Sequence, residues 1–95
     1  MFIVLLKFVG DPAGAVPLME DHKAWIQRGF EDGVFVLVGS LKPARGGTIV
    51  AHATSLEDLQ RRVSADPFVA ENVVSAEILE IAPARTDARL AFLAA

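Results

Sequence analysis

Hydrophobic positions in the first third of the chain follow two periods, one typical of a strand and one of a helix. Residues 2–8 carry large apolar side chains on both faces of a strand, so both faces are expected to be buried. Residues 17–32 repeat apolar positions at helical spacing, with Pro17 suited to the first helical position and Gly33 to the end. One stripe of this helix carries Leu18, His22, Trp25, Ile26 and Gly29.

The rest of the chain predicts three more strands and a second helix. The strands are expected at residues 34–39, 48–53 and 73–81, with a hairpin loop at residues 42–47. Ser55 is suited to cap the second helix, and Pro67 ends it because the residue before a proline is disfavoured in helical geometry. The order βαββαβ predicts an α+β, ferredoxin-like fold, a four-stranded antiparallel sheet with two helices on one face.

The expected sheet has more apolar surface than its two helices cover. An exposed apolar patch of that size is unusual on a soluble monomer. We therefore expect residues 1–82 to form one domain that pairs with a second copy as a homodimer, giving a dimeric α+β barrel. Residues 83–95 are a C-terminal extension, expected to be helical and to dock on the partner subunit. The alternative is that this extension covers its own sheet.

Composition narrows the function classes. The chain has 95 residues, a net charge of −3, 53% hydrophobic residues and no cysteine, so disulfides and thiolate chemistry are excluded. Only 9 residues are Lys or Arg, which argues against nucleic acid as a partner. No apolar run reaches the ~18–20 residues of a membrane span, and the N-terminus lacks signal-peptide features. We expect a cytoplasmic protein that does not bind membranes.

No cofactor or metal is expected from the sequence. The glycine-containing loops lack the spacing of a P-loop or of a dinucleotide-binding fingerprint. Glu20, Asp21 and His22 are adjacent on a helix and point in different directions, and His52 has no second ligand at a suitable spacing.

His22 and Asp66 are the candidate catalytic residues. An imidazole on the apolar stripe is desolvated, and a nearby carboxylate would tune it as a general base. The alternative is a core histidine bonded to backbone or serine. Asp66 precedes Pro67, so a simple helix N-cap is an equally good interpretation, and spacing alone does not show whether it contacts His22.

Gly39, Ser40 and Phe68 are the candidate substrate-binding residues. Ser40 lacks the G-x-S-x-G surroundings of a nucleophilic serine, so a hydrogen-bonding role is favoured. Gly39 precedes it at the end of the second predicted strand, and Phe68 belongs to the Asp66-Pro67-Phe68 turn.

Several short segments resemble the YCII-related (YciI-like) family over residues 1–82. They are the apolar first strand, Asp21-His22-Lys23-Ala24-Trp25-Ile26, Gly39-Ser40-Leu41 and Ala65-Asp66-Pro67-Phe68. The resemblance implies a dimeric α+β barrel and a pocket in which a His and an Asp, here His22 and Asp66, form a catalytic pair. Ser40 falls where the family's second strand ends beside that pocket. Superfamily relatives include muconolactone-isomerase-like and dehydrochlorinase-like enzymes, which need neither metal nor nucleotide.

Two functions remain open at this point. The first is a cofactor-independent isomerase or lyase that uses His22 and Asp66 for proton transfer on a small, partly apolar substrate. The second is a non-catalytic dimer that binds a small molecule or a partner protein in the same cleft. An electron-transfer or nucleic-acid module is excluded because the chain has no cysteines and lacks a basic surface.

Overall fold

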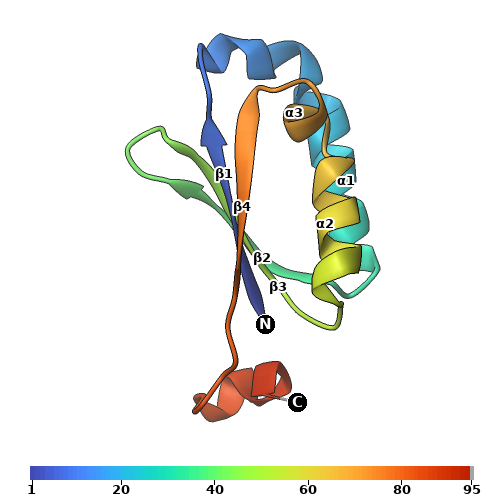
Figure 1. The fold of residues 1–95 in the computed structure, drawn as a ribbon, viewed down its shortest axis with the longest axis vertical. Coiled ribbons are helices and arrows are strands. Elements are labelled where there is room, and N and C mark those ends of the chain that lie inside the picture. Colours follow the sequence, from blue (N-terminus) through green and yellow to red (C-terminus); the bar gives the residue numbers. More distant parts are fainter. Residues whose placement is uncertain (95) are drawn as a thin grey trace.

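Strand β1 (Phe2–Phe8) lies inside the sheet because it has a paired neighbour on each side. It pairs antiparallel with β3 (Gly46–Ala51) along one edge and with β4 (Val74–Glu80) along the other. Strand β2 (Phe35–Leu41) pairs with β3, giving the order β2-β3-β1-β4. The computed structural model, which describes residues 1–94, thus confirms the predicted four-stranded antiparallel, ferredoxin-like fold (Figure 1).

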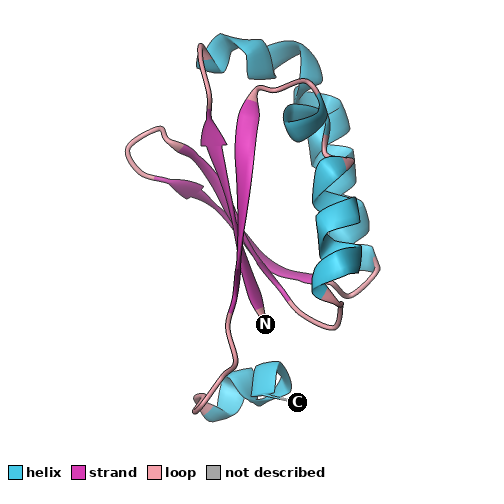
Figure 2. Ribbon diagram, in the orientation of Figure 1, coloured by secondary structure: helices cyan, strands magenta, loops and turns pink. Residues whose placement is uncertain are grey.

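The helices form a layer on one face of this sheet. Helices α1 (Met19–Glu31) and α2 (Leu56–Ser64) pack there, with the short α3 (Pro67–Ala70) beside them (Figure 2). Two 3-10 helices, η1 (Pro12–Leu18) and η2 (Ala88–Ala94), lie beyond opposite ends of the sheet. Within residues 1–94, no helix combines the length and apolarity needed to cross a bilayer.

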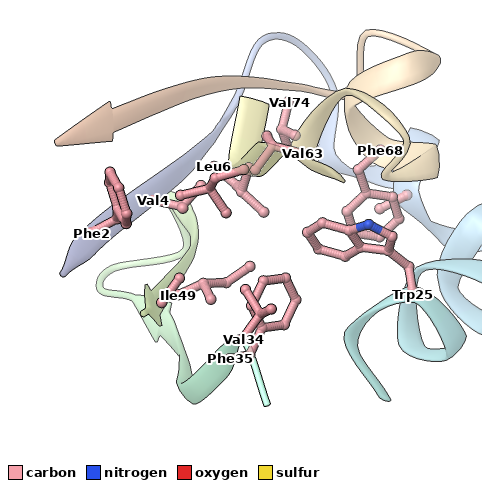
Figure 3. Packing of buried hydrophobic residues seen from close by; sticks show 13 residues of the cluster. Phe2, Val4, Leu6, Trp25, Val34, Phe35, Ile49, Val63, Phe68 and Val74 are labelled. Atoms are coloured by element: carbon pink, nitrogen blue, oxygen red, sulfur yellow. The ribbon is translucent and has the colours of Figure 1, made fainter. Parts of the chain in front are cut away.

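The core lies between the sheet and the helix layer. Phe2, Val4 and Leu6 of β1 are buried there, as their alternation in the sequence predicts. The Trp25 indole Nε1 donates a 3.0 Å hydrogen bond to the Arg62 carbonyl, which ties α1 to α2. Figure 3 shows the side chains converging; the buried cluster is Phe2, Val4, Leu6, Ala15, Trp25, Val34, Phe35, Ile49, Ala51, Leu59, Val63, Phe68 and Val74.

The start of the first helix differs from the prediction. The chain turns earlier, because the Asp11 carboxylate accepts a backbone hydrogen bond two residues on and Pro12 occupies the first position of η1. Pro17 therefore lies inside η1 instead of opening α1. Helix α1 begins at Met19 and ends at Glu31, so the predicted C-terminal end was nearly correct.

The predicted strands exist, but their bounds shift by one or two residues. Those expected at 34–39, 48–53 and 73–81 are observed at 35–41, 46–51 and 74–80. The hairpin is tighter than predicted because Gly46 joins β3. Its φ is 133°, and a Cβ there would overlap the Leu6 carbonyl oxygen, so glycine lets pairing with β1 begin this early.

The face of the sheet opposite the helices carries an apolar row that crosses all four strands. The antiparallel registers place Leu37, Val50, Ile3 and Leu79 side by side. Leu37 and Leu79, at the two edges, are 52% and 42% exposed. The structure therefore leaves uncovered the surface that the sequence predicts to be apolar.

The C-terminal extension leaves the sheet after β4. Met1 and Ile81 exchange two backbone hydrogen bonds there, of 2.9 and 2.8 Å. Further on, hydrogen bonds from Arg89 hold the pKa of Asp87 below its usual value. Leu93 of η2 is buried, and the Phe92 ring lies 5.3 Å from the His52 ring. Docking on a partner subunit stays a prediction.

A tight contact between α1 and β2 gives a test of the core. Gly29 is buried, and a Cβ at this position would overlap the Phe35 ring, which is only 2% exposed. A Gly29→Ala change gains about 1 kcal/mol of helix propensity but overpacks the core at a cost of about 1–3 kcal/mol. We expect a net loss of roughly 1 kcal/mol in the free energy of unfolding, measured by urea denaturation.

The matched control is Gly10→Ala, because no atom lies within 4 Å of a Cβ built there. We expect its free energy of unfolding to stay within about 0.5 kcal/mol of the wild type. A Gly29→Ala protein more stable than the wild type would contradict the assigned packing.

Candidate functional site

His22 and Asp66 lie in direct contact, although 44 residues separate them in the sequence. His22 Nδ1 and Asp66 Oδ1 are 2.7 Å apart, the short distance typical of a charge-assisted hydrogen bond. The Asp66 side chain is fully buried and that of His22 is 14% exposed. The structure therefore supplies the contact that sequence spacing could not show.

Asp66 is positioned by the proline that follows it. Pro67 disfavours helical geometry at the preceding residue, and Asp66 is extended, with φ −61° and ψ 127°, between α2 and α3. Its Oδ1 also accepts a 3.2 Å hydrogen bond from the Phe68 backbone N–H, so Asp66 is the N-cap of α3 as well. The capping interpretation and the His22 contact are both correct.

The second carboxylate oxygen of Asp66 lies in a different environment from the first. Oδ2 is buried and has no hydrogen-bond partner among residues 1–94. A buried carboxylate with one unpartnered oxygen is costly unless a positive charge lies nearby. The imidazole of His22 is the ionisable group that contacts this carboxylate, through its other oxygen, Oδ1.

The hydrogen bond also sets the tautomer of His22. An ionised Asp66 carboxylate can only accept, and opposite such a carboxylate Nδ1 carries the proton and Nε2 of the neutral ring is an acceptor. Nε2 has no partner among the residues that the structure describes. It is therefore the nitrogen available to a bound molecule.

Two aromatic side chains hold the His22 ring in place. The Phe68 ring is stacked on it at a centroid distance of 3.8 Å, with only 7° between the ring planes. Trp25, one turn further along α1, stacks less closely at 5.9 Å and is itself anchored to α2. Imidazole rotation is thus restricted by packing as well as by the carboxylate.

His22 lines a cavity of about 380 Å³ between α1 and the hairpin end of the sheet. Gly39, Ser40 and Phe68, the predicted substrate-binding residues, line the same cavity. Asp66 does not, and it reaches the cavity only through His22. The remaining wall is mostly apolar and consists of Leu6, Phe8, Met19, Lys23, Ile26, Val38, Gly46, Gly47, Thr48, Ile49 and Val74.

Some of these wall residues were not predicted from the sequence. Met19 lies three residues before His22, and Lys23 lies four residues after Met19, so the spacing of i, i+3 and i+4 positions starting from Met19 was the signal that could have found them. Gly46 and Gly47 were interpreted as a loop, but they belong to β3 and line the cavity.

A second hollow, of about 550 Å³, contains none of the predicted site residues. It lies along α1 and α2, and half of the residues that line it are charged. Two of its arginines are already paired, Arg62 with Asp32 at 2.8 Å and Arg61 with Asp58 at 2.7 Å. The smaller cavity at His22 is therefore the better candidate site, despite its lower volume.

The described residues contain no group of three or more His, Cys, Asp or Glu side chains placed to hold a metal ion. The arrangement at His22 is instead one suited to proton transfer, with an oriented imidazole in an apolar cavity.

The fold of this chain resembles that of a solved enzyme structure. It is the 5-chloro-2-hydroxyhydroquinone dehydrochlorinase from Burkholderia phenoliruptrix AC1100, in complex with 2,5-dihydroxybenzoquinone. The TM-score is 0.69 at 14% sequence identity, over 85% of this chain and 93% of the enzyme chain. At this identity the likeness shows a shared fold.

The sequence comparisons give the family. No curated protein matches the chain. The family model of the YCII-related domain matches residues 2–82, which include both His22 and Asp66. The match leaves out only the first residue and the C-terminal extension, and the chain therefore belongs to the YCII-related domain family.

Proposed function

We propose that this protein is a cofactor-independent enzyme of the isomerase or lyase type, acting by proton transfer on a small, partly apolar substrate. The observation that supports this most directly is the 2.7 Å hydrogen bond that orients His22 at the wall of an apolar cavity. A base held in one tautomer, with its other nitrogen free, meets the geometric requirement for proton abstraction.

In this proposal each predicted residue has a distinct role. His22 Nε2 accepts a proton from the substrate, and Asp66 stabilises the imidazolium that forms. The Ser40 hydroxyl donates a hydrogen bond to the oxygen on which negative charge develops. Gly39 leaves room for the substrate, since no atom lies within 4 Å of a Cβ built there, and Phe68 supports the His22 ring.

After His22 removes a proton from the substrate, the reaction can continue as an isomerisation or as an elimination. In an isomerisation, His22 returns the proton to a different atom of the substrate as the double bond moves. In an elimination, the electron pair forms a new double bond and expels a leaving group such as chloride, while solvent takes the proton from His22. Both outcomes need one base and an oxyanion donor, which this cavity provides.

The solved dehydrochlorinase supports an enzymatic function because it is an enzyme of the same fold with a small cyclic ligand. A ring of that size is compatible with a cavity of about 380 Å³. For the present chain we propose only the reaction class, isomerisation or elimination by proton transfer. Cyclic compounds with ionisable oxygen atoms are the first substrates to test.

We also propose that the protein is a homodimer formed through the open face of the sheet. The apolar row from Leu37 to Leu79 crosses every strand, so it offers a continuous surface to bury. Beside this row, Lys7 adds a positive charge and Glu77 a negative one, with Lys7 Nζ 4.0 Å from Glu77 Oε1. A face with apolar and oppositely charged groups can complement a second copy of itself across a two-fold axis.

Substitution of each member of the pair tests the catalytic role. In His22→Asn the amide N–H takes the place of Nδ1–H, so Asp66 keeps a donor while Nε2 is lost. We expect turnover of hydroxylated or chlorinated ring substrates to fall by ~10²-fold or more, followed by ultraviolet absorbance. In Asp66→Asn the carboxylate that stabilises the imidazolium is lost, and we expect a similar decrease.

His52→Ala is the matched control for this test, because His52 is the other histidine and does not line the cavity. We expect its turnover to equal that of the wild type. Unchanged turnover in both His22→Asn and Asp66→Asn would overturn the proposed mechanism.

Thermal and urea unfolding of the variants distinguish a catalytic from a purely structural pair. His22→Ala leaves Asp66 as a buried charge without its partner, so we expect a loss of about 3–5 kcal/mol in the free energy of unfolding. His22→Asn restores a donor, and most of that stability should return. If His22→Asn restores stability and also keeps full activity, the pair is structural and the protein is better described as a binding module.

Sedimentation velocity tests the dimer. A Leu79→Lys substitution places a charge at one end of the apolar row within the proposed interface, where burial without a partner is costly. We expect the wild type to sediment as two chains and this variant as one. The control is Val16→Lys, because Val16 is 73% exposed on η1, away from the sheet. A wild-type monomer at micromolar concentration would contradict the proposal.

A further inference from the structure

One cationic side chain, Lys23, lines the cavity besides the ionisable His22. Lys23 follows His22 on α1, and its side chain is 65% exposed. The wall that the structure describes contains no carboxylate, since Asp66 lies behind His22. An anionic group in this cavity would therefore meet a positive charge and no direct repulsion from the wall.

We propose that Lys23 selects substrates that carry an anionic oxygen group, a carboxylate or a phenolate, on an apolar ring. The apolar wall accommodates the ring and Lys23 pairs with the charged substituent near the cavity entrance. This inference rests on the proposed function for the identity of the site, and it adds the charge of the substrate.

The existing partner of Lys23 does not prevent this role. Lys23 Nζ and a Glu20 carboxylate oxygen are 4.0 Å apart, too far for a direct hydrogen bond. The Glu20 side chain is 92% exposed, so solvent screens this pair strongly. Lys23 can therefore exchange Glu20 for a ligand at little cost, and its long stem reaches over the apolar wall while the charge stays at the surface.

An anionic substituent also suits the chemistry at His22. When His22 takes a proton, it becomes positively charged next to a ring that gains negative charge. Lys23 lies one residue away on the same helix, and it stabilises that negative charge further out from the imidazole. Lys23 is a specificity-determining residue in this scheme and does not transfer the proton.

The test compares two probes that differ in charge but little in shape, benzoate and benzamide. Binding of each to the full chain is followed by the amide chemical shifts of Gly39, Ser40 and Gly47, which line the cavity. We expect benzoate to bind about two- to fivefold more tightly than benzamide, the range expected for one solvent-exposed charge pair, and its binding to weaken as salt is added. In Lys23→Gln the two dissociation constants should become equal, whereas Lys23→Arg should keep the preference.

Lys42→Gln is the matched control, because Lys42 is exposed on the hairpin and does not line the cavity. It should keep the wild-type preference for benzoate. Failure of benzoate to bind, equal binding of both probes to the wild type, or an unchanged preference in Lys23→Gln would overturn the proposal. Because the assay needs no turnover, unchanged turnover in His22→Asn and Asp66→Asn, which would overturn the proposed mechanism, would leave this binding result standing on its own.

Discussion

The hydrogen bond between His22 and Asp66 joins the two halves of the helix layer at the cavity. One partner comes from α1 and the other from the junction of α2 and α3, so the contact forms only when both helices are docked on the sheet. Because Asp66 is fully buried, removal of the donor would leave an uncompensated charge inside the protein. The interaction that orients the imidazole is therefore also part of what holds the helix layer together.

The proline that follows Asp66 explains how this one residue both contacts His22 and caps a helix. Pro67 forces Asp66 out of α2 and begins a new helical turn, which brings the carboxylate inward and places Phe68 on the His22 ring. One oxygen then serves as helix cap and imidazole partner. Substitution of Pro67, which does not line the cavity, would change the site indirectly, because Asp66 would no longer be restricted to its extended conformation.

Local rules account for most of the fold that could be predicted from the sequence. Alternation in β1 and helical spacing in α1 were sufficient because burial of these side chains dominates their energetics. The bounds at Pro17 and Gly46 were wrong because they depend on a capping Asp11 and on close approach to Leu6, neither of which is a periodic signal. The site required tertiary information, since Lys23 becomes a wall residue only through the placement of α1 over the hairpin end of the sheet.

The position of the cavity follows from the size of side chains along the helix-facing side of the sheet. Four large residues fill one row across the strands, namely Val38, Ile49, Val4 and Ile78. Two positions nearer the hairpin, the corresponding row is Ser40, Gly47, Leu6 and Ala76. Three of these four residues, Ser40, Gly47 and Ala76, are small, and they leave space beneath α1 where a close-packed core would otherwise continue. Dense packing that stops beside His22 therefore gives the imidazole both a rigid support and an open side.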